Sequence, residues 1–166
     1  MRVYLPATIP MLAVLAETGV LAVPLSAHAV TPALREWYTE GSVEELEYAA
    51  MVEAAEASLR LLHDDAGAPP RRVVVAAEVD VALAAPPGHE GPRSLVLLPG
   101  AVERRQVASV HVDDPAAADD VAAAVAAVPA AAAGGQDAQF TVDSAEGNDL
   151  LWYDVSELEI LLALGL

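Results

Sequence analysis

The pattern of apolar and polar residues along the chain predicts one long amphipathic helix. Between residues 43 and 63, apolar side chains recur at spacings of three and four, and most of the glutamates fall elsewhere around the helix. Ser42 precedes this pattern, and Glu45 lies three residues later. Their spacing is that of a capping box, in which each side chain accepts a hydrogen bond from the backbone N–H of the other residue. We therefore expect a helix over residues 43–63.

Capping signals predict four further helices. Thr8 and Thr31 are N-cap candidates ahead of apolar residues at helical spacing, and Asp114 precedes a proline and an alanine-rich run. Ser156 and Glu159 repeat the spacing of a capping box near the end of the chain. The expected helices cover residues 9–18, 33–40, 115–128 and 156–164, and the first three are expected to stop at Gly19, Gly41 and Pro129.

Short apolar runs bounded by turn-forming residues predict strands. Residues 73–77 do not alternate, which is typical of a strand buried on both faces, whereas residues 107–112 alternate and predict one apolar face. Pro24 lies within one run and favours an edge or a bulge there. The expected strands cover residues 2–5, 20–30, 73–77, 94–98, 107–112, 138–142 and 150–154. The connections expected to be mobile lie near residues 84–92 and 129–136.

The order of these elements is β-α-β-α-α-β-β-β-α-β-β-α. Three strands follow one another without a helix between them, which argues against a doubly wound parallel sheet. We therefore expect a single α+β domain over residues 1–166, built as a two-layer sandwich with a mixed, largely antiparallel sheet. A ferredoxin-like core with an inserted helical pair is one concrete form of this architecture.

Charge and cysteine content exclude several classes of function. The chain has 25 acidic residues against eight arginines, and its formal net charge is −17. Nucleic-acid binding needs clustered cations to displace the counterions of the phosphates, so we expect no nucleic-acid partner. The acidity either serves solubility, or mimics nucleic acid or docks a basic partner. Because cysteine is absent, disulfides, thiolate catalysis and cysteine-ligated metals are excluded.

The N-terminal segment resembles a secretory signal, but several residues oppose that interpretation. Arg2 precedes an apolar stretch, and Ala27 and Ala29 have the spacing of a cleavage site. Glu17 and Gly19 interrupt the apolar stretch, however, and the first residues alternate like a strand. We also expect no apolar run long enough to span a bilayer. The sequence thus favours a cytoplasmic protein with no membrane partner, whose first residues are retained and folded.

Histidine and carboxylates are the main candidates for catalysis or metal binding. His111 and Asp113 share one face of an expected strand, because side chains repeat every two residues. Two ligands do not make a metal site, so we expect no metal and no cofactor. Ser42 and Ser156 are better explained as caps than as nucleophiles. A small hydrolase that uses carboxylates and His111 stands as the alternative to a non-catalytic function.

Aromatic side chains concentrate in two dipeptides, Trp37-Tyr38 and Trp152-Tyr153. Neighbouring side chains point about 100° apart on a helix and to opposite faces of a strand, so one core does not easily hold both members of a pair. One interpretation is that one ring anchors the core while the other covers a seam. The other is that the outward rings line a shared recognition surface with Arg35, since Trp, Tyr and Arg dominate binding hot spots.

Four segments of the chain are informative together: RVYLPAT from residue 2, ALREWY from residue 33, ELEYAA from residue 45 and LLWY from residue 150. They resemble the segments of a small actinobacterial family of unknown function, DUF6912. The resemblance implies a cytosolic actinobacterial protein and implies no activity. A scarcity of residues with AT-rich codons agrees with a GC-rich genome. We expect a non-catalytic interaction or regulatory module with a protein partner that the sequence does not identify.

Overall fold

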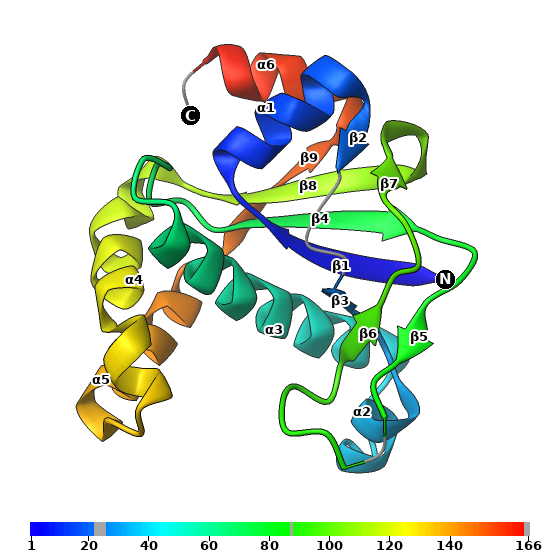
Figure 1. The fold of residues 1–166 in the computed structure, drawn as a ribbon, viewed down its shortest axis with the longest axis vertical. Helices are drawn as coiled ribbons and strands as arrows, with labels where there is room; N and C mark the ends of the chain where they lie inside the picture. The colour runs from blue at the N-terminus through cyan, green and yellow to red at the C-terminus, as the bar shows by residue number, and fades with distance from the viewer. Residues whose placement is uncertain (22–25, 87, 165–166) are drawn as a thin grey trace.

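An antiparallel sheet forms the centre of the protein (Figure 1). The computed structural model describes residues 1–21, 26–86 and 88–164. Within these residues, seven strands pair in the order β5-β6-β3-β1-β4-β8-β9. They are β1 (Arg2–Ala7), β3 (Ser26–His28), β4 (Val73–Glu78), β5 (Leu83–Ala84), β6 (Leu95–Leu97), β8 (Val107–Asp113) and β9 (Leu150–Asp154). Strands β2 (Val20–Leu21) and β7 (Val102–Glu103) pair separately.

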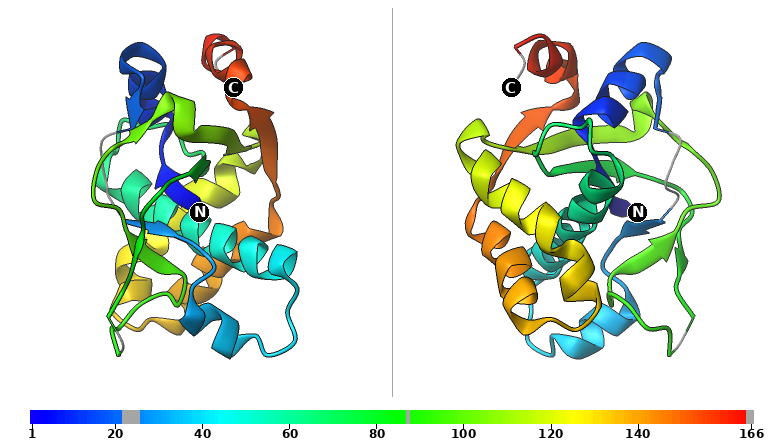
Figure 2. Two further views of the ribbon diagram at one scale, coloured as in Figure 1. Left: turned by 90° about the vertical axis from the view of Figure 1, so that its right-hand side faces the viewer. Right: turned by 60° about the vertical axis from the view of Figure 1, so that its left-hand side comes forward.

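Helices cover both faces of this sheet (Figures 1 and 2). One face carries α2 (Pro32–Trp37), α3 (Val43–Asp64), α4 (Ala118–Ala132) and α5 (Gln136–Ser144), and the other carries α1 (Ile9–Thr18) and α6 (Leu158–Ala163). Helix α3 crosses the sheet, and α4 and α5 pack against its C-terminal half. The sandwich that we expected to have two layers therefore has helices on its second face as well.

Strand β1 shows why both faces are covered, because its side chains alternate between two cores. Val3 and Leu5 are buried in the cluster that includes residues of α1 and α6. Tyr4 points to the other face, where it packs with residues of α2 and α3. The strand lies inside the sheet, between β3 and β4. The N-terminal segment is thus folded, as the alternation of its residues predicts.

The α+β class is confirmed, and among the described residues each pair of neighbouring strands in the seven-stranded sheet is antiparallel. In a β-α-β-β-α-β ferredoxin-like core, the two strands of each split β-α-β unit lie on either side of a strand from the other unit. Strands β1, β4, β8 and β9 instead lie side by side in the order in which the chain forms them. The core is therefore a different antiparallel arrangement.

The first predicted capping box is present, and the second is not. The Glu45 N–H donates to the Ser42 hydroxyl at 3.2 Å, and the Ser42 N–H donates to the Glu45 carboxylate at 2.8 Å. At the second site, Asp154 accepts from the backbone N–H of Ser156 at 2.9 Å. Glu159 does not bond to the backbone of Ser156, because its carboxylate pairs with Arg104. A tertiary ion pair has replaced the local bond that the spacing predicts.

Substitution of Ser42 by alanine is expected to lower the free energy of unfolding by about 1 kcal/mol, because it removes the N-cap of α3. Ser156→Ala is the matched control, since the hydroxyl of Ser156 caps no helix in this structure. This control is expected to change stability by less than about 0.5 kcal/mol. Urea unfolding followed by circular dichroism measures both values. Equal losses for the two variants would contradict the assignment of the caps.

Helical structure continues beyond Pro129, which corrects the predictions that a helix stops there and that residues 138–142 form a strand. Helix α4 continues through Pro129 to Ala132, and α5 covers the residues predicted as a strand, 138–142. Pro129 removes one helical hydrogen bond, but the packing of α4 against α3 and α5 holds the helix together. Val142 and Ala145, three residues apart, are buried in the same cluster. Burial of this helical face outweighs the local preference for a strand.

A tight turn joins α4 to α5. The backbone N–H of Gly135 donates to the Ala130 carbonyl at 2.9 Å. A Cβ atom on Gly135 would also lie 2.9 Å from that carbonyl oxygen, so this approach requires glycine. Gly134 has a φ of 93°, which lies in the left-handed region that glycine adopts without strain. The two glycines therefore close a helical hairpin.

Several other helices and strands differ from those predicted. Helix α2 ends at Trp37, with Tyr38 as its C-cap, and so stops before Gly41. The expected strand over residues 20–30 is represented by the separate strands β2 and β3, and the expected irregularity at Pro24 lies outside the described residues. Strands β5 and β7 were not predicted, because two residues are too few to show the alternation of apolar and polar side chains that indicates a strand.

One helical stretch, Pro115–Ala132, is long and apolar enough to cross a membrane by length and composition alone. We expected no such stretch. The many alanines of this stretch explain why it passes the test, because alanine raises the mean hydropathy although its small side chain buries little surface. In this structure Val121 and Ala124 of the stretch pack against α3 and α5. One such helix is weak evidence for a membrane span, since a helix of a globular domain passes the same test.

Candidate functional site

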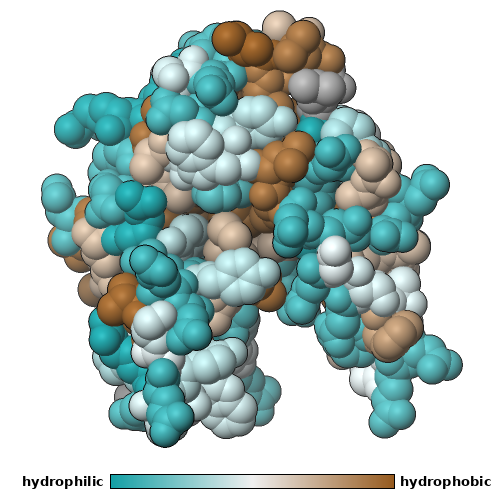
Figure 3. All heavy atoms as spheres, turned by 180° about the vertical axis from the view of Figure 1, so that it is seen from behind, coloured by the Kyte–Doolittle hydropathy of each residue, from teal (hydrophilic) through white to brown (hydrophobic). Residues whose placement is uncertain are grey.

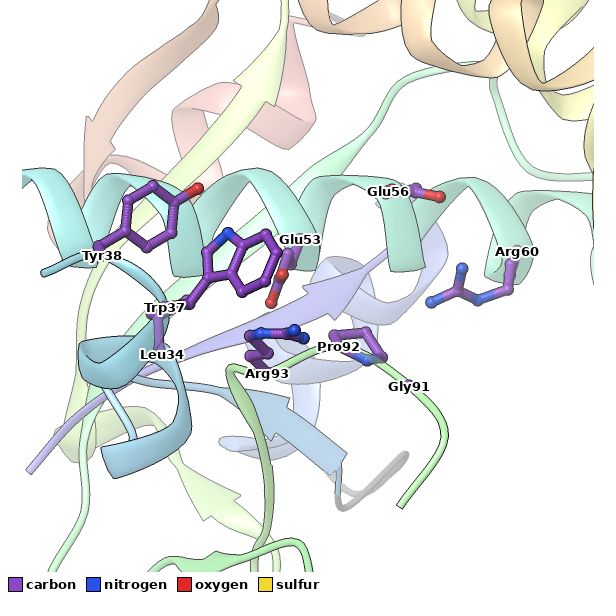
Figure 4. Close-up of a pocket in the computed structure, with 9 residues that line it drawn as sticks. All are labelled: Leu34, Trp37, Tyr38, Glu53, Glu56, Arg60, Gly91, Pro92 and Arg93. Carbon is purple, nitrogen blue, oxygen red and sulfur yellow. The ribbon is translucent and has the colours of Figure 1, made fainter. Parts of the chain in front are cut away.

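A cavity of about 470 Å³ lies between α2, α3 and the segment 91–93 (Figure 4). Its lining residues are Leu34, Trp37, Tyr38, Glu53, Glu56, Arg60, Gly91, Pro92 and Arg93. Seen from behind, the molecule is hollowed between the lobe that carries α2 and the lobe that carries α4 and α5 (Figure 3). A second, smaller cavity shares Glu56 and Arg60 with the first and extends to α4 and α5. The candidate site is thus formed by the charged side of α3, which carries Glu53, Glu56 and Arg60, and by the aromatic residues at the end of α2.

A buried hydrogen-bonded chain fixes one wall of this cavity. The hydroxyl of Ser94 donates to the Glu53 carboxylate, and the Ser94 backbone N–H donates to the same oxygen at 3.2 Å. His28 Nδ1 lies 2.8 Å from the Ser94 hydroxyl oxygen. Burial, and then the charge of Arg60, lowers the pKa of His28 to about 4, so its ring is neutral at pH 7. Because Ser94 is fully buried, this chain positions the backbone rather than presenting a nucleophile.

The wall formed by segment 91–93 brings Arg93 over the ring of Trp37. The guanidinium carbon lies 3.9 Å from the ring centroid, which is a cation–π contact. The Thr31 hydroxyl, which caps α2, also donates to the Arg93 carbonyl oxygen. Both ends of α2 are therefore attached to the segment before β6, the start by the Thr31 hydroxyl and the end by the Trp37 ring. The cation beside this ring is Arg93, whereas the hypothesis from the sequence named Arg35.

The charged groups of the cavity differ in how far they are already paired. Glu53 is engaged by Ser94, whereas Glu56 accepts no hydrogen bond from the described residues. Burial raises the pKa of Glu56, as do the charges of Asp143 and Glu53, while Arg60 opposes the shift. Glu56 and Arg60 have the spacing of a helical ion pair, but they do not form one in this structure. Both side chains remain available to a bound group.

The segment that joins α2 to α3 is exposed and combines aromatic with acidic side chains. Trp37 exposes 63% and Tyr38 45% of its surface, so neither ring anchors the core. The exposed glutamates of this segment are Glu36, Glu40, Glu44 and Glu45. Together with Trp37 and Tyr38, we call these glutamates the α2–α3 surface. Arg35 is also exposed, but it does not line the cavity.

The two aromatic dipeptides do not form one surface. Trp152 and Tyr153 lie on β9, which is one edge of the sheet. Helix α2, which carries Trp37, lies near the opposite edge, and the views in Figures 1 and 2 agree on this separation. Trp152 is 61% exposed, whereas Tyr153 is partly buried against the core. The shared surface that we considered therefore does not form. Of the two dipeptides, Trp37-Tyr38 is the one that lines the cavity described above.

The structure does not pair His111 with the carboxylate of Asp113. Asp113 is fully buried, and its carboxylate accepts hydrogen bonds from Arg72 instead. The Nε2 atom of His111 lies 3.1 Å from the hydroxyl oxygen of Ser109. Burial, and then the charge of Arg2, lowers the pKa of His111. In the described part of the chain, no three residues of the types His, Cys, Asp and Glu are placed to hold a metal.

Most residues of the cavity carry no recognisable signal in the sequence. Arg93 lies in the connection before β6, and no motif marks it. Glu53, Glu56 and Arg60 belong to the polar side of a helix, which solvent alone would explain. Only Trp37 and Tyr38 were predicted as binding residues from their unusual adjacency. The cavity depends on a contact between segments about 40 to 60 residues apart, which hydrophobic periodicity does not encode.

One comparison identifies the relatives of this chain. The model of a family of unknown function, DUF6912, matches residues 1–162. The chain belongs to this family. DUF6912 membership confirms the resemblance that the four segments indicate, and it assigns no activity, because none is known for the family. No curated protein and no solved structure matches the chain.

Proposed function

We propose that the protein is a non-catalytic interaction module that binds a basic segment of a protein partner with its α2–α3 surface. The observation that carries this proposal is the exposure of two consecutive aromatic residues, Trp37 and Tyr38, within an acidic segment. Large aromatic side chains in contact with water are stabilised when a partner covers them. Trp and Tyr are also the residues that most often dominate binding energy.

The charge of this surface selects the class of partner. Four exposed glutamates lie close to the two rings in sequence, and the formal charge of the whole chain is −17. Such a field attracts cationic segments and repels acidic ones during association. Lysine and arginine side chains also stack on Trp and Tyr rings. A basic, extended peptide segment therefore matches both features of the surface.

The proposal predicts that Trp37→Ala will weaken the binding of a basic peptide by roughly 30-fold or more, as expected when a hot-spot residue is removed. The probe is a fluorescein-labelled peptide of alternating arginine and glycine, and fluorescence anisotropy gives its dissociation constant. The double variant Glu40→Lys, Glu44→Lys is expected to weaken binding and to reduce its dependence on salt, because exposed charges are screened. Glu45 is left unchanged, since it caps α3.

Two control variants separate recognition from general effects. Trp152→Ala removes a tryptophan of similar exposure on the opposite edge of the sheet, and Glu157→Lys reverses an exposed charge there. Both are expected to bind the peptide as the unmodified protein does. The proposal fails if these controls weaken binding as much as Trp37→Ala does. It also fails if no binding is detected up to about 1 mM peptide.

A further inference from the structure

Two arginines that have no hydrogen-bonded partner among the described residues face the same cavity. Figure 4 shows the guanidinium groups of Arg60 and Arg93 directed into it from opposite ends. The arginines that donate to carboxylates or carbonyls of the protein are Arg2, Arg71, Arg72, Arg104 and Arg105. Arg35 has no such partner either, and it lies outside the cavity. In a chain with 25 acidic residues, the convergence of two unpaired guanidinium groups points to an anionic group between them.

The guanidinium of Arg93 is held ready for such a group. Its face stacks on the ring of Trp37, and stacking leaves the N–H donors in the plane of the group free. The backbone beside it is fixed by the bonds of Ser94 to Glu53. A side chain held in this way loses less conformational entropy when it binds a ligand. Arg93 is thus organised before any ligand arrives.

The same cavity also presents a negative charge that lacks a partner. Glu56 lies on α3 one turn before Arg60, and it accepts no hydrogen bond from the described residues. With Glu53, it balances the two arginines, so the charged residues that line the cavity sum to zero. A multiply charged anion is therefore disfavoured by the two carboxylates and by the overall charge of −17. A neutral molecule with separated positive and negative groups matches this lining.

We infer that this cavity binds a small zwitterion of the amino-acid class. The carboxylate of the ligand lies between Arg60 and Arg93, and its ammonium group lies against Glu56. Its side chain packs in the part of the cavity formed by Leu34 and Tyr38. A volume of about 470 Å³ is within the range of small-molecule sites. This inference rests on the two arginines and is independent of the binding of a basic peptide to the α2–α3 surface.

The test uses Trp37 as the reporter, because its ring touches Arg93 at the cavity. Trp152→Phe leaves Trp37 as the single tryptophan, since the chain has two. Each of the standard amino acids without an indole or phenol ring is titrated against this variant, and the fluorescence of Trp37 is measured. We expect at least one to bind. The inference is overturned if none changes the fluorescence up to about 10 mM, a range that includes weak metabolite sites.

Two derivatives of the amino acid that binds identify the groups that are recognised. The amide lacks the carboxylate, and the N-acetyl derivative lacks the ammonium group. Each is expected to bind about tenfold more weakly or worse, because each loses a charge-assisted contact. Undiminished binding of either derivative would overturn the zwitterion assignment.

Variants locate the contacts. Arg60→Gln and Arg93→Gln are each expected to weaken binding of the amino acid about tenfold or more. Glu56→Gln is expected to weaken binding of the amino acid while leaving binding of its N-acetyl derivative unchanged. Arg35→Gln is the matched control, since Arg35 is exposed and unpaired but outside the cavity. Equal effects of Arg35→Gln and Arg60→Gln would overturn the inference, and melting temperatures confirm that each variant is folded.

Discussion

A chain that lacks residues 1–7 is expected to show no cooperative unfolding transition. These residues form β1, which lies inside the sheet and pairs along its whole length with β4, from Arg2 opposite Glu78 to Ala7 opposite Val73. The deletion would leave β3 and β4 with unpaired edges and would open both cores, because β1 contributes to each. Circular dichroism during urea or thermal unfolding measures the result. A truncated chain with an unchanged melting temperature would contradict the fold described here.

Point variants in the same region give a graded form of this test. Leu5→Ala is expected to lower the free energy of unfolding by about 2–5 kcal/mol, because the side chain is 2% exposed and its removal leaves a cavity. Val14→Ala on α1 is the control, since that side chain is 49% exposed. It is expected to change stability by less than about 0.5 kcal/mol. Similar effects of the two substitutions would show that β1 is not part of the core.

The second large effect is expected from Asp113→Ala. Asp113 is fully buried, and its carboxylate accepts from the backbone N–H of Arg72 at 2.7 Å and from the Arg72 guanidinium at 2.8 and 2.9 Å. Its carbonyl oxygen accepts from the Arg71 guanidinium at 2.6 and 3.0 Å. Loss of the carboxylate leaves a buried guanidinium without a counter-charge. We therefore expect the free energy of unfolding to fall by about 3–5 kcal/mol.

Two further variants show whether that loss arises from the unpaired charge. Asp114→Ala changes the next residue, whose exposed carboxylate caps the start of the following helix, and it is expected to cost about 1 kcal/mol. The double variant Arg72→Met, Asp113→Leu replaces the ion pair by apolar groups and is expected to recover most of the lost stability. Urea unfolding measures all three. A loss below about 1 kcal/mol for Asp113→Ala would contradict a buried, fully engaged pair.

The proposals for the site concern one region but depend on different residues. Docking of a basic segment depends on exposed aromatic rings and glutamates of the α2–α3 surface. Binding of a zwitterion depends on Arg60 and Arg93 inside the cavity. Trp37 contributes to the surface and also stacks on Arg93. Binding of either the zwitterion or the peptide is therefore expected to change the fluorescence of Trp37. Each proposal has variants that leave the other intact.

The elements that the sequence determined are those whose free energy comes from local contacts and simple periodicity. Helix α3 was predicted almost to its ends, because its capping box and its apolar face both lie within the segment itself. Strands β1, β4 and β8 were predicted because their apolar runs are long enough to be read and are buried in the sheet. Strand β9 was predicted from its apolar run as well, although Leu151 and Trp152 remain exposed. The exposed pair Trp37 and Tyr38 was also recognised as unusual from its adjacency alone.

Tertiary structure decided the elements in which distant contacts outweigh local preference. Residues 138–142 favour a strand by composition but form part of α5, because Val142 is buried against α3 and α4. Glu159 has the spacing of a cap but pairs with Arg104 instead. The cavity exists because segment 91–93 is held beside α3 by the bonds between Ser94 and Glu53. This segment places Arg93 on the ring of Trp37 and in the same cavity as Arg60. These contacts join segments far apart in the chain, and their free energy depends on a geometry that only the folded sheet and helices supply.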